Sequence, residues 1–333
     1  MDKPLKYAVF GAGSWATAIV KMLSENLDEI GWYMRSVYTK EHLLKEQHNP
    51  NYLSSVEFNL EQLKLSNDIN EIADYADVLI FVIPSAFMHS ELEKLNINIS
   101  NKVIVSAVKG IMPETGLLVG EHFHKTYKIP FDSIAVIAGP CHAEEVALER
   151  LSYLTISCSD TEKAKTIADT LSSNYIKTKT SDDVIGVEYA VMLKNIYAIA
   201  AGIAHGLGYG DNFQSVLMSN AIREMKRFIK KRHKMKRNIN ETVYLGDLLV
   251  TGYSVFSRNR MFGNMIGKGY TVKSAQMEMS MIAEGFYAAK SAFLINQESK
   301  TPSKAPIINT VYEILYLHKN PKESFKKLTE KLC

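Results

Sequence analysis

Short apolar runs alternate with stretches of helical periodicity through the first half of the chain. Six apolar runs predict strands: Leu5–Phe10, Ile30–Met34, Val78–Ile83, Lys102–Val108, Ile134–Ala138 and Tyr153–Cys158. Most are apolar at nearly every position, as expected when helices cover both faces of a parallel sheet. Helical patterns lie between them at Trp15–Glu25, Phe87–Leu95 and Glu162–Ser173. Strand and helix in repetition predict an α/β fold with a doubly wound sheet.

The pattern changes after about Ser181 and Asp182. Long helical segments then dominate: Val184–Ala204, Ser215–Lys231, Ala275–Asn296 and Ile307–Leu317. Strand patterns largely vanish in this part of the chain. We therefore expect an N-terminal Rossmann-type domain over residues 1–182 and an all-α C-terminal domain over residues 183–333.

Composition and charge narrow the classes of protein. The 333 residues are 46% hydrophobic and 23% charged, as in soluble globular proteins. A formal net charge of +3 is close to balance and predicts no nucleic-acid partner. The pattern of a signal peptide is missing, as are the roughly 18 to 20 consecutive apolar residues of a membrane span. Three widely spaced cysteines, Cys141, Cys158 and Cys333, indicate free thiols, so we expect a cytoplasmic protein without an integral membrane segment.

A glycine-rich turn follows the first predicted strand and opens a helix, with the sequence GAGSWA at residues 11–16. Gly11 permits a tight turn, Gly13 lets the backbone approach a pyrophosphate, and the helix N-terminus faces the phosphate charge. This context favours a dinucleotide site over an ordinary glycine-rich turn. Arg35 ends the second strand, where an NAD-selective site usually has an acid, so it favours NADP or tolerance of NADP. A solvated surface arginine is the alternative.

Two further strand ends carry candidate ligand-binding groups. Lys109 comes just after a strand, and ligands of open α/β sheets bind beyond the carboxyl ends of the strands. A plain exposed lysine is the alternative. Another strand ends at residues 139–143, GPCHA, where backbone amides of the turn could face an anion. Cys141 in this turn is interpreted as a small packed thiol rather than a nucleophile.

Lys194 is the most informative single residue. It lies inside Val184–Ala204, which is apolar almost all round, as in a buried helix. A lysine there is costly unless it is paired, neutral or in a cavity, or unless its side chain reaches the surface. Asn195 beside it and Glu188 six residues earlier are also polar. We expect this part of the helix to line a site.

Polar groups for an anionic substrate occur later in the chain. Asp247 enters an apolar run, with a helix N-cap as its alternative role. The sequence SRNR at residues 257–260 combines arginine, serine and asparagine, which suit a phosphate monoester. His122 and His124 have metal-ligand spacing, but no further ligands cluster near them in the sequence. We expect no metal.

Seven motifs in order resemble the NAD(P)-dependent glycerol-3-phosphate dehydrogenase family of bacteria. They are GAGSWATA at 11–18, VKG at 108–110, GPCHAEEV at 139–146, LKNIYAIAAGIAHGLGYGDN at 193–212, LGDLLVT at 245–251, SRNRMFG at 257–263 and AEG at 283–285. The resemblance implies hydride transfer from NAD(P)H to dihydroxyacetone phosphate, giving sn-glycerol 3-phosphate for phospholipid synthesis. It also implies a homodimer, with the helical domain holding substrate and dimer contacts.

Residue roles follow from the same resemblance. Lys194 matches the proton acceptor of the family. The implied substrate-contacting positions are Lys109, Gly139, Cys141, Lys194, Asp247, Ser257, Arg258 and Asn259. The implied cofactor positions, added to Gly11 and Gly13, are Ser14, Trp15, Arg35, Lys109, Ala143, Arg258, Ile282 and Glu284. Cys141 stands where a serine is common in the family, which leaves its side-chain contact to substrate open.

Two other functions remain as alternatives. A related dehydrogenase for another hydroxyacid would share the two domains and a helix-borne lysine, but would lack the SRNR block. A dinucleotide-sensing binding protein would leave Lys194, Lys109 and Asp247 without a purpose. The preference between NADH and NADPH, the oligomeric state and any feedback regulation stay open. So does the role of residues 223–237, nine basic residues with one acid, whose first interpretation is a solvated face.

Overall fold

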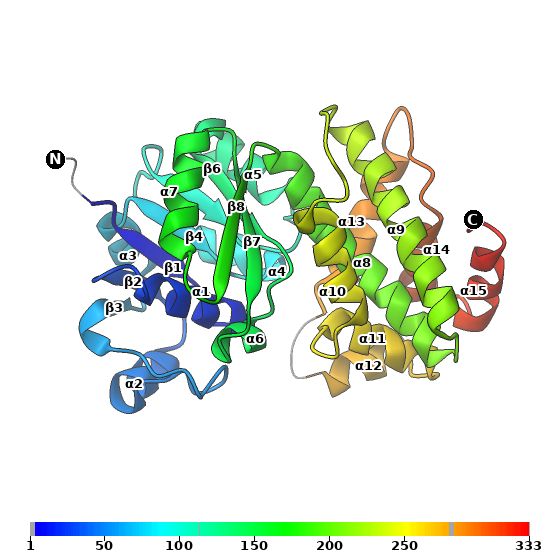
Figure 1. The fold of residues 1–333 in the computed structure, drawn as a ribbon, viewed down its shortest axis with the longest axis horizontal. Helices are drawn as coiled ribbons and strands as arrows, with labels where there is room; N and C mark the ends of the chain where they lie inside the picture. Colours follow the sequence, from blue (N-terminus) through cyan, green and yellow to red (C-terminus); the bar gives the residue numbers. More distant parts are fainter. Residues whose placement is uncertain (1–3, 113, 280–282, 333) are drawn as a thin grey trace. The chain divides into compact units, whose positions relative to one another are not determined.

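The computed structural model describes residues 4–112, 114–279 and 283–332. These residues form two compact units. Figure 1 shows the fold as a ribbon coloured along the sequence. One unit contains the chain up to Val108 together with Leu117–Val184. The other contains Lys109–Gly116 together with the chain from Ile185 onward. Lys109 therefore belongs with the helical part of the protein.

The first unit is built on an eight-stranded sheet. Its strands are β1 (Tyr7–Phe10), β2 (Ile30–Tyr33), β3 (Leu63–Ser66), β4 (Val78–Phe81), β5 (Val103–Ser106), β6 (Ile134–Ala138), β7 (Ser152–Cys158) and β8 (Ile176–Ser181). They are ordered β3-β2-β1-β4-β5-β6-β7-β8, and every neighbouring pair is parallel except β6 and β7. Because the order reverses between β1 and β4, the sheet has a topological switch point there. The predicted doubly wound α/β fold is confirmed.

The two strands that the sequence did not predict, β3 and β8, are the edges of this sheet. The sequence of β3 is LKLS, with polar residues at alternate positions, and that of β8 is IKTKTS, which is polar after its first residue. An edge strand has a neighbour on one side only and is more open to water, so it tolerates such residues. A search for continuous apolar runs therefore finds the six central strands and misses the edges.

Helices cover both faces of the sheet. They are α1 (Ser14–Ser24), α2 (Val37–Glu46), α3 (Ile69–Tyr75), α4 (Ser85–Leu92), α5 (Val119–Tyr127), α6 (Ala143–Ala147) and α7 (Thr161–Leu171), with 3-10 turns at η1 (Leu60–Gln62) and η2 (Phe131–Ser133). Successive side chains of a strand point to opposite faces. On β1, Val9 packs in one buried cluster with Ile19 of α1. Phe10 stacks on Phe81 at 4.7 Å between ring centroids, and Phe81 packs against Phe123 of α5.

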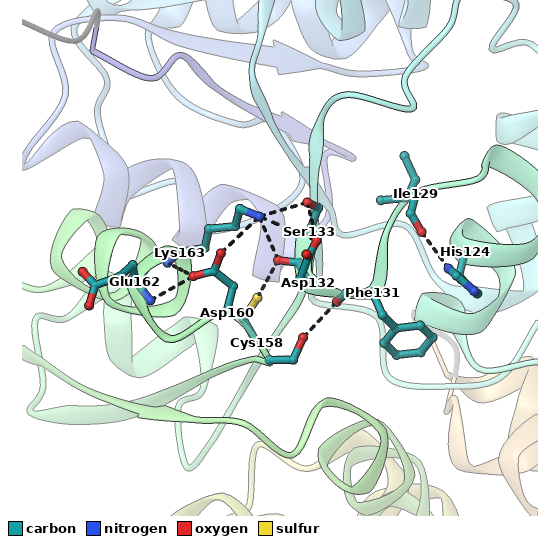
Figure 2. A network of polar contacts seen from close by, with 10 residues as sticks. His124, Ile129, Phe131, Asp132, Ser133, Cys158, Asp160, Glu162 and Lys163 are labelled. Atoms are coloured by element: carbon teal, nitrogen blue, oxygen red, sulfur yellow. Dashed lines mark hydrogen bonds and ion pairs between the residues drawn. The ribbon is translucent and has the colours of Figure 1, made fainter.

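A polar network ties the start of α7 to the start of β6, as Figure 2 shows. The Asp160 carboxylate caps α7 by accepting hydrogen bonds from the backbone N–H groups of Glu162 and Lys163. The Lys163 ammonium donates to the Asp132 carbonyl oxygen at 3.1 Å and to the Ser133 hydroxyl at 3.1 Å. The Cys158 thiol donates to the same carbonyl at 3.4 Å, and burial raises its pKa. Cys158 is therefore a packed structural thiol.

The second unit is helical. Its helices are α8 (Val184–Gly206), α9 (Asp211–Arg232), η3 (Thr242–Gly246, a π-helical turn), α10 (Asp247–Tyr253), α11 (Arg258–Gly267), α12 (Val272–Glu278), α13 (Gly285–Gln297), α14 (Pro306–Tyr316) and α15 (Pro321–Thr329). The single helix expected over Ala275–Asn296 was wrong. α12 ends at Glu278, where Met279 has extended backbone, and α13 begins at Gly285, whose N–H donates to the Asn259 side chain.

α8 is the central helix of this unit. It is long and apolar enough to cross a membrane, but 94% of its most apolar window is buried inside the protein, as in a core helix of a globular domain. The sequence prediction of a buried helix is confirmed.

Four glycines let α8 and α11 pack backbone to backbone. Gly202 and Gly206 lie one turn apart on α8, and Gly263 and Gly267 lie one turn apart on α11. A Cβ atom added to any of them would collide with backbone atoms of the other helix. Glycine is therefore required for this close approach. The two helices run parallel, which brings the first turn of α11 beside the middle of α8.

Candidate active site

A cavity of about 340 Å³ opens in the first unit at the switch point of the sheet. Three chain segments that follow β1, β2 and β4 form most of its wall, as expected for ligands of doubly wound sheets. The lining residues are Gly11, Ala12, Gly13, Tyr33, Arg35, Ser36, Thr39, Asn51, Tyr52, Val82, Ile83, Pro84, Phe87 and Glu91. The cavity brings together three of the predicted cofactor residues, Gly11, Gly13 and Arg35.

The glycine-rich turn has the shape that a pyrophosphate requires. Gly11 has a φ of +127°, and a Cβ atom there would lie 3.0 Å from the Val82 carbonyl oxygen. Gly13 is the N-cap of α1, and a Cβ atom there would have nothing within 4 Å. The N-terminus of α1 is therefore open on the side of Gly13. The N–H groups of its first turn and the helix dipole favour an anion there. These residues fit the phosphates of a dinucleotide.

The other predicted residues of the first unit lie outside the lining of this cavity. Ser14 and Trp15 form the first turn of α1, and Ala143 begins α6. Gly139 has a φ of +135°, and a Cβ atom there would lie 2.6 Å from the Tyr153 carbonyl oxygen. Its glycine is explained by packing against β7. Cys141 is half-buried and packs against the apolar cluster of the sheet, which fits the interpretation of a packed thiol.

Lys194 and Asp247 form a buried ion pair in the second unit. The Lys194 Nζ atom of α8 lies 2.5 Å from the Asp247 Oδ1 atom of α10. Their side chains are 9% and 2% exposed. Gly246 holds the N-cap position of α10, so the capping role considered for Asp247 was wrong. The buried Asp247 Oδ2 atom has no hydrogen-bond partner among the described residues, and it could accept a bond from a bound ligand.

Two asparagine side chains connect the segments around this pair. The Asn259 Nδ2 atom donates to Asn195 Oδ1 at 2.9 Å, and Asn195 Nδ2 donates to the Lys109 carbonyl oxygen at 3.4 Å. Asn259 Oδ1 accepts from the Gly285 N–H at 2.9 Å. Both asparagines are buried. The network holds the Lys109 segment, α8, α11 and the start of α13 together, so Asn259 positions these segments.

Asn195 has a role in this network that the sequence did not assign to it. It was recognised only as a polar residue beside Lys194. Its signal was the presence of an amide on an otherwise apolar helix. Its two partners, Lys109 and Asn259, are distant in sequence, so the pattern along the helix could not identify them.

Charge gathers around the Lys109 ammonium. Four charged side chains act on it: Lys194, Arg258, Glu284 and Asp247. Desolvation, together with the positive charges of Lys194 and Arg258, lowers the pKa of Lys109 to about 8. The two carboxylates oppose it. Three cations against two carboxylates leave one net positive charge, which favours an anionic ligand.

The first turn of α11 adds groups that suit a phosphate. Ser257 is the N-cap of this helix, and its hydroxyl accepts a hydrogen bond from the Arg260 N–H at 3.3 Å. Arg258 is the first helical residue and is half-buried. A helix N-terminus with an arginine attracts an anion through both the backbone dipole and the guanidinium.

The remaining predicted residues lie at the start of α13. Glu284 is the N-cap residue of this helix and is half-buried. Ile282 lies outside the described residues. No group of three or more His, Cys, Asp and Glu side chains lies close enough to hold a metal ion within residues 4–112, 114–279 and 283–332.

Two family models match the chain. The model described as NAD-dependent glycerol-3-phosphate dehydrogenase N-terminus matches residues 6–164, and the C-terminus model of that description matches residues 183–326. A glycerol-3-phosphate dehydrogenase [NAD(P)+] of Oceanobacillus iheyensis is 33% identical over 326 residues, covering 97% of this chain and 93% of the relative. A protein of that description from Streptococcus sanguinis is 32% identical over 335 residues, covering 98% and 96%.

Solved structures agree with these matches. Glycerol-3-phosphate dehydrogenase of Coxiella burnetii has a TM-score of 0.89 and 26% identity, covering 98% of this chain and 99% of that one. D-mandelate dehydrogenase has a TM-score of 0.62 and 13% identity, covering 94% and 98%. The second likeness shows a shared fold alone.

Proposed function

Because the chain belongs to the NAD-dependent glycerol-3-phosphate dehydrogenase family, we propose that it reduces dihydroxyacetone phosphate to sn-glycerol 3-phosphate with NAD(P)H. Its family makes it an oxidoreductase that acts on a CH–OH group. The observation that carries the proposed chemistry is the buried Lys194–Asp247 ion pair. The charges of this pair and of Arg258 all act on the Lys109 ammonium. A lysine held this way is suited to proton transfer at a ketone oxygen.

Each group of the second unit has a proposed role. Arg258 and Ser257, at the first turn of α11, bind the substrate phosphate. The Lys109 ammonium stabilises negative charge that develops on the ketone oxygen. The Lys194 ammonium donates its proton to this oxygen, and Asp247 holds the ammonium in place. In glycerol phosphate oxidation the same amine accepts the hydroxyl proton.

The glycine-rich cavity of the first unit is the proposed site of the dinucleotide. Gly11, Gly13 and the first turn of α1 hold the pyrophosphate, and Arg35 lies where the adenosine ribose would be recognised. The nicotinamide, when bound, supplies the hydride to the ketone carbon and accepts it in the reverse reaction. Ser14, Trp15, Ala143, Ile282 and Glu284 are proposed as further cofactor contacts, and Gly139 and Cys141 as further substrate contacts, on the family resemblance alone.

Cellular context follows from the family. We propose a cytoplasmic homodimer that supplies the glycerol phosphate backbone for phospholipid synthesis. The net positive charge of the substrate site suits a phosphorylated ketone better than an uncharged one.

The test is consumption of NADPH or NADH, followed by absorbance, when dihydroxyacetone phosphate is added to the purified protein. We expect turnover with this ketone and little with an unphosphorylated 2-keto acid. Turnover with the 2-keto acid alone would replace the proposal by a hydroxyacid dehydrogenase. Binding of the dinucleotide without turnover of either ketone would indicate a dinucleotide-sensing protein.

A further inference from the structure

A carboxylate lies beside Arg35 in the wall of the dinucleotide cavity. Glu91, near the end of α4, lines the cavity together with Arg35, and its Oε1 atom is 3.6 Å from the Arg35 guanidinium. The Glu91 side chain is 4% exposed, whereas that of Arg35 is 67% exposed. The acid is therefore a fixed part of the wall, and the arginine is the partner that is free to move.

Neighbouring donors hold Glu91 in its charged form. The Tyr33 hydroxyl donates to its Oε2 atom at 2.6 Å, and the Lys94 ammonium donates to Oε1 at 2.8 Å. Desolvation acts to raise the pKa of Glu91, but the bonds from Lys94 and Tyr33 outweigh it and the net shift is downward. A buried negative charge therefore lies against the cavity at neutral pH.

Arg35 is held from a second side by an aromatic ring. Its guanidinium carbon lies 5.9 Å from the centroid of the Phe87 ring, which also lines the cavity. Phe87 and Glu91 both lie on α4, one turn apart. This helix thus contacts the guanidinium of a residue that lies just after β2, the place at which doubly wound folds distinguish the two dinucleotides.

We propose that Glu91 sets the choice between NADH and NADPH by pairing with the Arg35 guanidinium that a 2′-phosphate would otherwise engage. NADPH must separate this pair and place a phosphate close to the Glu91 charge. NADH carries a 2′-hydroxyl at that place and does neither. The carboxylate thus offsets the preference for NADPH that an arginine at the end of β2 would confer alone. The inference rests on the proposed dinucleotide site.

The test compares dissociation constants of NADPH and NADH for purified Glu91→Gln, measured by titration without any ketone. Glutamine keeps the shape of the side chain and one oxygen that can accept a hydrogen bond from the Tyr33 hydroxyl, while its charge is removed and the half-exposed Lys94 ammonium turns to water. We expect NADPH binding to tighten about five- to tenfold, as for the loss of one nearby like charge, and NADH binding to change less than about twofold. Glu93→Gln is the control, because Glu93 is an exposed acid next to the end of α4 that pairs with His89 and lies outside the cavity lining.

A double-mutant cycle shows whether Glu91 acts through Arg35. In an Arg35→Gln background, Glu91→Gln should tighten NADPH binding less than it does in the unmodified protein, because the pair no longer exists and only the repulsion between Glu91 and the phosphate remains. An unchanged ratio of the two dissociation constants in a folded Glu91→Gln variant would overturn the proposal. An equal gain in both backgrounds would overturn its dependence on Arg35. If the unmodified protein binds neither dinucleotide, the proposed dinucleotide site fails as well, whereas loss of ketone turnover alone leaves this inference standing.

Discussion

The Lys194 Nζ atom lies 2.5 Å from the Asp247 Oδ1 atom, in a part of the second unit where both side chains are nearly inaccessible to water. Removing one partner of such a pair leaves the other charge buried and uncompensated. The same contact that is proposed to prepare the lysine for proton transfer therefore also matters for stability. A substitution at Lys194 has to be designed so that these two effects are measured apart.

Lys194→Met should lower turnover by at least about two orders of magnitude, since it removes the proposed general acid–base group. It should also lower the free energy of unfolding by about 3 to 5 kcal/mol, because Asp247 loses its partner. The double variant Lys194→Met with Asp247→Asn should recover most of this stability and none of the turnover. Melting curves and turnover in both directions are the measurements. A double variant that keeps more than about a tenth of the activity would show that another group transfers the proton.

Arg258→Ala should raise the KM for dihydroxyacetone phosphate at least about tenfold, because a charged hydrogen bond of this kind contributes about 1.5 to 3 kcal/mol. Lys268→Ala removes a positive charge at the other end of α11 and serves as the control. Its KM should stay within about twofold of the unmodified protein, as for a solvated surface charge. Equal KM values for the two variants would place the phosphate away from the first turn of α11.

The efficiency of ketone reduction should fall as the pH rises above about 8. The pKa of Lys109 is lowered to about 8, so its ammonium is charged below this pH and loses its positive charge above it. With that charge the site loses attraction for an anionic substrate. Lys109→Arg keeps its charge at all accessible pH values, so the fall in kcat/KM should move to higher pH. Lys273→Arg, at an exposed position of α12, should leave the profile unchanged, and an unchanged profile in Lys109→Arg would assign the step to another group.

Gly263→Ala should destabilise the protein by about 3 kcal/mol, the upper range for overpacking, because the added methyl collides with the α8 backbone. Turnover should fall at temperatures where the variant stays folded, since α11 carries Arg258. Gly210→Ala adds the same atom where nothing lies within 4 Å, at a φ of −83°, and is the control. Equal melting temperatures for the two variants would show that the helices can separate without cost.

The central strands were predictable because most of them are apolar at nearly every position. β1 and β4, for example, read YAVF and VLIF and are fully buried. The helix break between α12 and α13 was not predictable. The apolar periodicity continues through it, and the start of α13 is held by a bond from the Gly285 N–H to Asn259, which lies 26 residues away.

Motif residues were found by sequence because their types are unusual for their surroundings, as Lys194 is on an apolar helix. Their partners were not found in this way. Asp247 lies 53 residues after Lys194 in the chain, and it faces Lys194 only because of how α10 packs against its neighbours. Glu91 and Glu93 are two acids at the end of α4, and only the position beside Arg35 distinguishes Glu91.

The sequence by itself determined the doubly wound sheet, the buried helix α8, the glycine-rich turn and the family. These properties depend on local periodicity and on motifs whose residues are close together in the chain. Only the tertiary structure decided that Lys109 belongs with the helical unit, that Asn195 and Asn259 connect four segments, and that Arg35 is paired with Glu91. Such pairings depend on which backbones can approach one another, as the four glycines of α8 and α11 allow, and that distance is not encoded in any single stretch of residues.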